Sequence, residues 1–419
     1  MKKMVLLMIM IFVAFFFFFH KEALPPIKVG VLHSLSGTMA MNERPVMEAT
    51  LLAIEDINAQ GGLLGRQVEA IIVDSESNSA TFAREAKYLI VDQKVSALFG
   101  CWTSSSRKTV KPIVEKYHSL LFYPVQYEGL EQSDYIAYLG AVPNQQIFPA
   151  VDWSLKHLGS RVYLVGSDYI FPRMANWLIR QQIQIKHGHV VGERYIPMGH
   201  RNMSDVITDI QKLHPDVILN TINGDSNIAF FHALKEAGIQ AKDTPVMSFS
   251  LGESELLSLG GDAEGDYASW SYFQSIDNPV NADFVGRYHA RFGSGKPVSD
   301  PMEAAWVAVH LWAEAVRSAQ TDDVNAVRRV IKHQSMVAPE GIVSIDHGTR
   351  HAWKTGRIVQ VDGKHHFRVI WSSKQLIRPI PYPLFISKNK AKSFMDALYQ
   401  TWGGNWEAPD PLVQGGSHE

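Results

Sequence analysis

Short continuous apolar runs alternate along this chain with longer segments in which apolar residues recur at helical spacing. Residues 27–32 and 68–73 are such runs, and between them the segment 45–58 places its apolar side chains on one face. Short apolar runs predict strands that are buried on both faces, and helical spacing predicts amphipathic helices. Strands separated by helices in this way predict a parallel sheet covered by helices on both sides.

The same alternation divides the chain into two successive units, followed by further helices and a hairpin. The first unit is predicted to contain strands at 27–32, 68–73, 95–99 and 120–124 and helices at 45–58, 81–93 and 109–117. The second begins near residue 144 and is predicted to contain strands at 162–165, 190–196, 217–220, 245–249 and 267–273 and helices at 147–158, 174–186, 203–213 and 226–237. Helices at 282–292, 301–318 and 323–333 and a β-hairpin at 357–371 follow. We therefore predict an α/β protein of two lobes, each with its own sheet.

The N-terminus carries a pattern typical of export. Three residues, Met1-Lys2-Lys3, precede an uninterrupted apolar run over residues 4–19. A basic start followed by an apolar core is typical of a secretory signal, and the run is short for a membrane span. No small-x-small cleavage pattern follows it, so an uncleaved anchor stays an alternative. We predict that residues 1–25 are a signal peptide or N-terminal anchor and that the protein is periplasmic or otherwise extracytoplasmic.

Composition and motifs exclude several classes of function. Lys and Arg number 40 against 42 Asp and Glu, which gives no electrostatic footprint for nucleic acid. Cys101 is the single cysteine, so an internal disulfide and a cysteine-rich metal site are excluded. Residues 293–297 lack the first glycine of a phosphate loop, and Pro297 stands where Ser or Thr would bind magnesium. No nucleophile elbow or zinc-helix motif occurs, and we predict no enzymatic activity, no cofactor and no metal.

One stretch, residues 99–108, has the features of a ligand-binding corner. A predicted strand ends there in glycine and small hydroxyl residues, and a helix follows. In an open α/β sheet, ligands sit outside the carboxyl ends of the strands, where backbone N–H groups at a helix start are unpaired. Trp102 would supply an apolar wall, and Thr103 and Ser104 would supply short donors and acceptors. We interpret this stretch as the floor of a small-molecule pocket.

Aromatic and polar side chains recur at other predicted strand ends, where a sheet crevice would lie. Capping of the next helix is the alternative for single residues such as Asp168 or Ser226, but capping alone does not explain the recurrence in both units. A crevice with few charges fits a small neutral ligand, because Arg107 and Arg173 are expected on the helix side of their motifs. The predicted ligand contacts beyond the first corner are Tyr123, Val125, Gln126, Tyr127, Asp168, Tyr169, Phe171, Asn223, Asp225, Glu253 and Tyr272.

Several sequence blocks resemble a known family. Residues 27–37 and 56–66 resemble the periplasmic binding proteins of branched-chain amino acid type. Within that superfamily, a further set of blocks is similar to the urea and short-chain amide branch. These blocks are residues 100–104, 123–129, 143–146, 166–169, 223–227, 272–275 and 338–341, and the resemblance runs from about residue 27 to 383.

The resemblance implies a two-lobed fold of the periplasmic-binding-protein type I class. Each lobe would carry a mostly parallel sheet with helices on both faces, and three crossovers would join the lobes around a ligand cleft. We predict that residues 26–145 and 278–342 form the first lobe and 146–277 and 343–385 the second, with a C-terminal tail over 386–419.

The resemblance also implies the substrate-binding component of an ABC importer. Such a protein closes its lobes on urea or a short-chain aliphatic amide and delivers it to a membrane permease with a separate ATPase. In this branch, the positions that hold the amide match Trp102, Ser104, Tyr123 and Tyr169. Trp102 and Phe171 replace tyrosines of relatives and Val125 replaces a hydroxyl residue, which leaves urea, formamide and acetamide open.

The expected binding mode depends on the shape of urea, a flat molecule with an acceptor oxygen and several N–H donors. We expect its plane to stack on Trp102 and on aromatic groups of the other lobe. Ser104 or a backbone N–H would donate to its oxygen. Tyrosine oxygens, carbonyl groups or a carboxylate such as Asp168 would accept from its N–H groups.

Three alternatives stay open at this point. The same fold could serve as an amide sensor that signals to a separate regulator, or it could bind a branched-chain amino acid, although the carboxylate clamp of that group is not clearly preserved. The third alternative is an amide hydrolase that uses Glu128, Asp168 or Cys101. A hydrolase would need a placed histidine or a metal to activate water, and the sequence offers neither.

Overall fold

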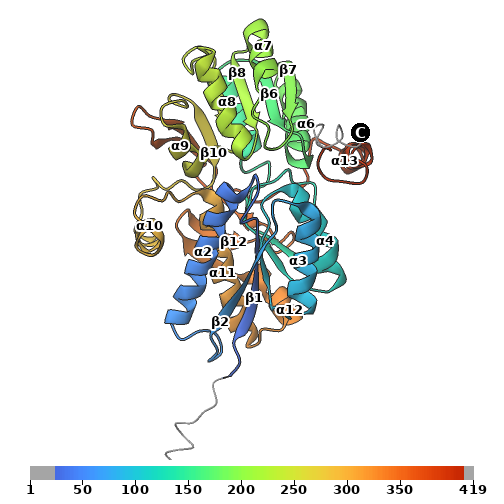
Figure 1. Cartoon of the computed structure of the whole chain (residues 1–419), viewed down its shortest axis with the longest axis vertical. Helices are drawn as coiled ribbons and strands as arrows, with labels where there is room; N and C mark the ends of the chain where they lie inside the picture. Colours follow the sequence, from blue (N-terminus) through green and yellow to red (C-terminus); the bar gives the residue numbers. More distant parts are fainter. Residues whose placement is uncertain (1–23, 410–419) are drawn as a thin grey trace, which may run out of the picture.

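The computed structural model describes residues 24–409, which form two lobes stacked along the long axis of the molecule (Figure 1). All but the last two residues of the predicted signal peptide or anchor lie outside the described residues. Between residues 24 and 409, no helix combines the length and the apolar character that crossing a membrane requires.

The first lobe is built on a five-stranded parallel sheet in the order β2-β1-β3-β4-β5. Helix α2 packs beside α11 and α3 beside α4, and one hydrophobic cluster joins the helices to the sheet (Figure 1). The strands are β1 (Ile27–His33), β2 (Val68–Asp74), β3 (Leu98–Gly100), β4 (Leu121–Tyr123) and β5 (Ile136–Tyr138). The helices are α2 (Ala40–Ala59), α3 (Ser79–Val91), α4 (Ser104–Lys116), α10 (Pro279–Phe292), α11 (Asp300–Ala319), α12 (Val324–Val330) and the 3₁₀ turn η1 (Ile331–His333).

The second lobe is built on a seven-stranded sheet in the order β15-β14-β10-β9-β8-β6-β7. Five strands are parallel, and β14 and β15 join one edge as an antiparallel hairpin, as predicted. The strands are β6 (Arg161–Ser167), β7 (His189–Ile196), β8 (Val217–Thr221), β9 (Val246–Ser248), β10 (Tyr267–Trp270), β14 (Arg357–Val361) and β15 (Phe367–Ser372).

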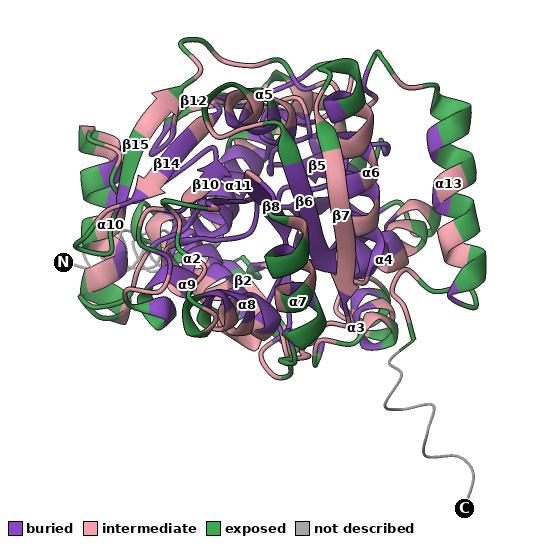
Figure 2. Ribbon diagram, turned by 90° about the horizontal axis from the view of Figure 1, so that it is seen from above, coloured by how far each residue is buried: buried purple, intermediate pink, exposed green. Residues whose placement is uncertain are grey.

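Helices cover both faces of this second sheet (Figure 2). The central strands β6, β8 and β9 are buried between them, whereas most residues of the edge strands β7 and β15 are partly or fully exposed. One hydrophobic cluster lies under α5 and α6, and another under α7, α8 and α9. The helices are α5 (Ile147–His157), α6 (Ile170–Ile185), α7 (Ser204–Leu213), α8 (Asp225–Glu236), α9 (Glu253–Leu259) and α13 (Lys388–Thr401). The predicted two-lobed α/β architecture is therefore confirmed.

The chain passes between the lobes three times, from β5 to α5, from β10 to α10 and from β13 to β14. A small antiparallel sheet of β11 (Ser335–Ala338), β12 (Gly341–Ile345) and β13 (Ala352–Trp353) precedes the last passage. Val343, Ile345 and Ala352 of this sheet pack in the first-lobe cluster, so the predicted boundary between residues 342 and 343 falls inside it.

Several elements differ from the sequence-based expectation. Helix α4 begins at Ser104, five residues before the predicted start, because the Thr103 side chain caps it by accepting from the Ser106 N–H at 3.0 Å. Strand β10 ends at Trp270, so Tyr272 lies on the crossover and packs in the first-lobe core. Strands β5 and β11 to β13 and helix α9 were not predicted, since each is short and carries little periodic signal.

Candidate functional site

The two lobes contact each other directly along the seam between them. The Asn42 amide of α2 hydrogen-bonds the Glu255 carboxyl of α9, and the Gln126 amide donates to the Phe249 carbonyl at 3.0 Å. Gly224, before α8, lies so near the first lobe that a Cβ there would be 3.2 Å from the Thr38 carbonyl oxygen. The structure is therefore a closed form, in which residues at the strand ends of both lobes face a shared seam.

The first-lobe corner begins where β3 ends against β1. A Cβ at Gly100 would lie 2.0 Å from the Leu32 carbonyl oxygen, so this close approach requires glycine. Trp102 and Thr103 follow and lead directly into α4, and both are buried. The Tyr123 hydroxyl, at the end of β4, donates to the Trp102 carbonyl oxygen at 2.6 Å. This bond fixes the two predicted aromatic residues of the first lobe relative to each other.

A buried charge cluster lies directly behind this corner. The Arg107 guanidinium of α4 is fully buried and donates to Glu128 at 3.1 Å and to Glu131 at 3.0 Å. The Lys108 ammonium donates to the second oxygen of Glu131 at 3.1 Å. Burial by itself raises the pKa of Glu131, but Arg107 and Lys108 hold it well below its usual range. The two cations balance the two carboxylates, so neither cation is left for a ligand.

The cluster also fixes the hydroxyl of Ser104. The Ser104 O–H donates to a Glu128 carboxylate oxygen at 2.5 Å, and the Ser104 oxygen accepts from the Arg107 guanidinium at 3.0 Å. A hydroxyl has a single proton, and here that proton is already committed to Glu128. Of the two donors expected for a ligand oxygen, Ser104 is therefore already committed in this structure, and a backbone N–H stays the predicted alternative. What the Ser104 oxygen retains is acceptor capacity, which suits a ligand N–H group.

The second-lobe corner follows β6 and carries Asp168 and Tyr169. Tyr169 is 2% exposed. Burial raises the pKa of the Tyr169 hydroxyl well above its ordinary value, Tyr123 and Glu128 raise it further, and Arg107 lowers it. Tyr169 immediately precedes α6, and α6 packs against α4 of the first lobe, so Tyr169 lies opposite the first-lobe corner. Asp168 does not cap α6, because its carboxylate forms a bidentate ion pair with Arg173 at 2.8 and 2.9 Å.

A cavity of about 340 Å³ lies at the seam directly beside Tyr169. Thr38 and Ser77 of the first lobe line it together with Asp168, Tyr169, Pro197 and Met198 of the second. The C-terminal residues 405 and 407–409 line it as well. Cavities of this size hold small molecules. The structure thus brings Trp102, Thr103, Ser104, Tyr123, Asp168 and Tyr169 to the two corners that face this seam.

The remaining predicted contacts lie at varying distances from these corners. The Phe171 ring centroid is 6.3 Å from that of Tyr169, and Val125 is buried against Gly140. The Tyr127 hydroxyl bonds His351 at 2.5 Å inside the first lobe. Gln126 serves the contact between the lobes described above, so its role in this structure is structural.

Four further predicted residues also have structural partners. The Asn223 backbone N–H donates to Ser167, and Asp225, the first residue of α8, pairs with Arg201 at 3.4 Å. The Tyr272 hydroxyl donates to Asn281 at 2.6 Å in the first-lobe core. The assignment of these residues and of Glu253 as ligand contacts rests on the sequence alone.

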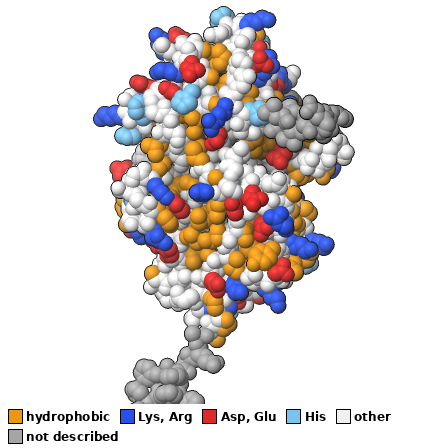
Figure 3. All heavy atoms as spheres, viewed as in Figure 1, with side chains coloured by type: hydrophobic (Ala, Val, Ile, Leu, Met, Phe, Trp, Pro, Cys, Tyr) orange, Lys and Arg blue, Asp and Glu red, His pale blue; other side chains and the backbone are white. Residues whose placement is uncertain are grey.

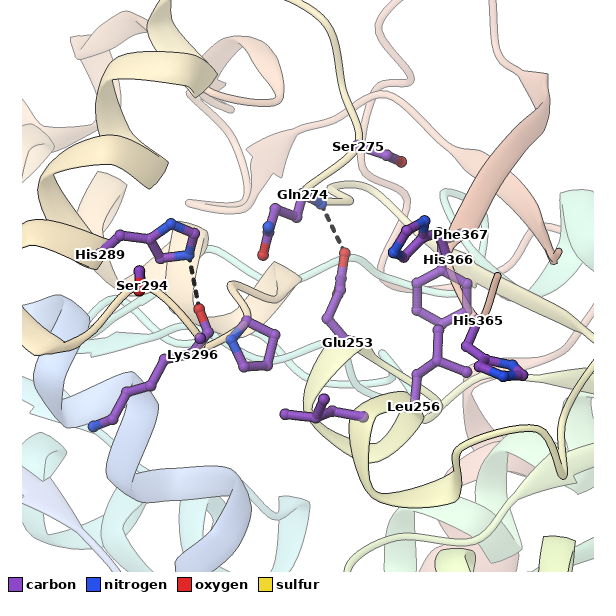
Figure 4. Close-up of a pocket in the computed structure, with 13 residues that line it drawn as sticks. Glu253, Leu256, Gln274, Ser275, His289, Ser294, Lys296, His365, His366 and Phe367 are labelled. Atoms are coloured by element: carbon purple, nitrogen blue, oxygen red, sulfur yellow. Dashed lines mark hydrogen bonds between the residues drawn. The ribbon is translucent and has the colours of Figure 1, made fainter. Parts of the chain in front are cut away.

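Glu253 lines a different pocket, of about 470 Å³, near the crossovers (Figure 4). Its carboxyl accepts from the Gln274 backbone N–H at 2.7 Å, and burial raises its pKa to about 8. Apolar walls from Leu256 and Phe367 and the side chains of three histidines, His289, His365 and His366, surround it. This pocket opens beside α9 and α10, away from the Tyr169 cavity.

Sequence reasoning missed the charge cluster behind Ser104. Arg107 is expected on the helix side, and Glu128 is expected as a strand-end carboxylate or, in the hydrolase alternative, as a catalyst, but no ion pair between the two is predicted. A signal was present, because residues 107–108 and 128–131 each place two like charges directly after a predicted binding motif. On the molecular face in Figure 3, charges of both signs are interspersed, in agreement with the balanced composition.

Comparison with known proteins identifies the family. Residues 27–388 match the model of a periplasmic binding protein domain. The chain is 24% identical over 337 residues to the Leu/Ile/Val-binding protein homolog 6 of Brucella melitensis, covering 78% of this chain and 85% of that one. It is also 29% identical over 119 residues to a limonene hydroxylase of Geobacillus stearothermophilus, but spans only 21% of that protein's length and 28% of its own.

A solved structure has the same fold. It is the solute-binding protein of an ABC transporter from Rhodopseudomonas palustris HaA2 in complex with p-hydroxybenzoic acid, with a TM-score of 0.76 and 24% identity. The match covers 84% of this chain and 98% of that chain. The chain therefore belongs to the periplasmic binding protein family, and its solute-binding homologues are binding components of ABC transporters and not enzymes.

Proposed function

We propose that this protein is the extracytoplasmic substrate-binding component of an ABC importer and that it binds urea or a short-chain aliphatic amide by closing its lobes. The secretory pattern at residues 1–25 supports export, and the permease with its separate ATPase would be the partner. We also propose that the first lobe extends beyond residue 342 through β13.

One observation carries the choice of ligand class, namely the charge cluster behind Ser104. Arg107 and Lys108 are both occupied by Glu128 and Glu131. A carboxylate ligand buried at this corner would have no free cation, and burying an unpaired charge is costly. A neutral ligand with N–H groups would instead find the acceptor oxygen of Ser104 and the aromatic surfaces of Trp102 and Tyr169.

The energetics agree with a ligand of this size. Neutral hydrogen bonds contribute about 0.5–1.5 kcal/mol each, and bonds to charged acceptors about 1.5–3 kcal/mol. Several such bonds together, with water excluded by lobe closure, give roughly −8 kcal/mol, which corresponds to micromolar affinity. Two lobes are needed because so small a ligand offers little surface and must be enclosed.

A branched-chain amino acid is the second candidate, favoured by the kinship with the Leu/Ile/Val-binding homologue. The related structure holds p-hydroxybenzoic acid, and both of these ligand classes carry a carboxylate. The two candidates therefore differ in the charge that the corner must accept.

A thermal-shift and calorimetry panel separates them. We expect millimolar urea, formamide or acetamide to raise the melting temperature, because a ligand at about 100 times its Kd adds about 2.7 kcal/mol of stability. Leucine and p-hydroxybenzoate are the ligands with a carboxylate, and they should leave the melting temperature unchanged. A shift with leucine or p-hydroxybenzoate and none with the three amides would overturn the proposal.

A further inference from the structure

The C-terminal part of the chain returns to the seam between the lobes (Figure 1). Helix α13 lies on the second lobe, with an exposed outer face and a buried inner stripe (Figure 2). Ala391, Met395 and Trp402 are buried in the second-lobe cluster, and Phe394 stacks on Trp177 of α6 at 5.4 Å. The helix therefore anchors the segment after it, residues 402–409, which we name the C-terminal strap.

Backbone hydrogen bonds tie this C-terminal strap to the second-lobe corner. The Ile170 N–H donates to the Trp406 carbonyl oxygen at 2.9 Å, and the Ala408 N–H donates to the Asp168 carbonyl oxygen at 3.0 Å. Tyr169 and Glu407 form an antiparallel bridge between these two bonds. The C-terminal strap thus runs as an added strand along the residues that present Tyr169 to the seam.

The same segment also contacts the first lobe, through α4. The Lys108 ammonium lies 5.0 Å from the centre of the Trp406 ring, and it also lies 3.4 Å from the sulfur of Met395 in α13. The Glu407 carboxyl forms a hydrogen bond with the Ser105 side chain. Lys108 belongs to the buried charge cluster, and Ser105 is the neighbour of Ser104. The C-terminal strap therefore touches both binding corners in the closed form.

Glu407 differs from the other carboxylates near the seam. Asp168 is paired with Arg173, and Glu128 and Glu131 are paired with Arg107 and Lys108. For Glu407, the described residues offer the Ser105 hydroxyl and no cationic side chain. Burial raises the pKa of Glu407, and the Ser105 bond opposes that rise. Because it also lines the cavity beside Tyr169, it places an uncompensated carboxyl at the mouth of the cleft.

We propose that the C-terminal strap is a third wall of the solute cleft, which links the two lobes in the closed form, and that Glu407 selects against anionic solutes. The first part rests only on the contacts above. The second part rests on the proposed function, because it concerns the charge of the solute that enters the same cleft.

Truncation tests whether the C-terminal strap forms a wall of the cleft and links the lobes. A chain ending after Gly404 loses the contacts of Trp406 and Glu407 but keeps α13 and the buried Trp402, and a chain ending after Pro409 is the matched control. We expect solution scattering of the shorter chain without ligand to show a larger radius of gyration than the control. We also expect it to bind urea about tenfold more weakly. Equal radii of gyration for the two truncated chains would overturn the proposal that the C-terminal strap links the lobes, whatever ligand the protein binds.

Acetamide and acetate test the charge selection, since they have nearly the same shape and differ in charge. We expect Glu407→Gln to raise acetate affinity relative to acetamide about tenfold and to leave acetamide affinity within about threefold. Asp396→Asn, the same change of charge on exposed α13, should leave the ratio unchanged. No gain of acetate binding in E407Q overturns the role of Glu407. If the unmodified protein binds none of acetamide, formamide and urea, that result counts against the proposed function. The scattering experiment then tests the structural role of the C-terminal strap independently of any ligand.

Discussion

The corner after β3 and the corner after β6 face each other across the seam, yet they are stabilised by different means. In the first, Ser104 is fixed by Arg107 and Glu128 in a fully buried network. In the second, no hydrogen-bond partner of the Tyr169 hydroxyl occurs among residues 24–409, and the backbone is paired with the C-terminal strap. The first corner is therefore preformed within its own lobe, whereas the second depends on a segment from the far end of the chain.

The arginines that follow the two corners provide the sharpest test of this contrast. Arg107 is fully buried, and Arg173 is 29% exposed. Arg107→Ala leaves two buried carboxylates without their main partner and should lower the free energy of unfolding by about 3–5 kcal/mol. Arg173→Ala breaks a partly exposed pair and should cost about 0–1 kcal/mol.

Unfolding in guanidinium chloride measures the free energy of unfolding of both variants. Urea is not used as the denaturant because it is a proposed ligand. Equal losses for the two variants would remove the distinction between the corners. If Arg107→Ala does not accumulate as folded protein, Arg107→Lys keeps the charge without the two-pronged geometry and should show an intermediate loss.

The two lobes also differ in how their surroundings shift the pKa of a buried carboxyl group. Glu131 in the first lobe has its pKa lowered by two cations, so the stability it contributes is lost only as pH falls through that lowered value. Asp266 in the second lobe is buried with one donor, the Val246 N–H at 2.8 Å, and burial raises its pKa from 3.8 to about 8. Between these two values, folded Asp266 binds a proton that the unfolded chain has lost. Its contribution therefore declines as pH rises from about 4 to about 8.

Asp266→Asn should flatten this part of the stability profile. One proton accounts for at most about 1.4 kcal/mol per pH unit, and the asparagine can still accept from Val246. Thermal unfolding across pH 4–8 measures the slope, and exposed Asp243→Asn serves as the control. Parallel profiles for D266N and the unmodified protein would mean that Asp266 is ionised in the folded state.

The smallest expected effects separate the two tyrosines. Tyr123→Phe removes the bond to the Trp102 carbonyl and should lower stability by about 0.5–1.5 kcal/mol. Tyr169→Phe removes no bond within the described residues, so stability should stay unchanged while urea affinity falls about tenfold. Calorimetry and thermal unfolding of both variants give the comparison. A stability loss in Y169F that matches Y123F would show that both hydroxyls have internal partners.

The sequence predicted the lobes well because local periodicity encodes them. The apolar runs of β1, β2, β6 and β7 and the helices between them stand close to their predicted positions. Short elements such as Ile136–Tyr138 escaped, since three residues carry no period and form a strand only beside β4. Helix α4 starts earlier than predicted because Thr103 caps it, so that polar Ser104 to Lys108 form its first turns, although their sequence carries no apolar period.

The candidate site was predictable in its strand ends and not in its charges. Trp102 and Ser104 follow strand β3, and Tyr123 ends strand β4 of the same parallel sheet. The carboxyl ends of parallel strands meet at one edge of the sheet, which brings these residues together. Arg107 is buried only because Glu128 and Glu131, more than twenty residues away in the chain, meet it in space. The proton of Ser104 could not be assigned without those partners.

The sequence by itself determined the alternation of strands and helices, the two lobes and the polar character of the strand ends, because these depend on neighbours a few residues apart. Tertiary structure alone decided which charges neutralise one another, which way the Ser104 hydroxyl donates, and that the C-terminal strap closes beside Tyr169. Those outcomes depend on contacts between segments far apart in the chain, such as the bond of Ile170 to Trp406 and the contact of Lys108 with the Trp406 ring, and no local pattern encodes them.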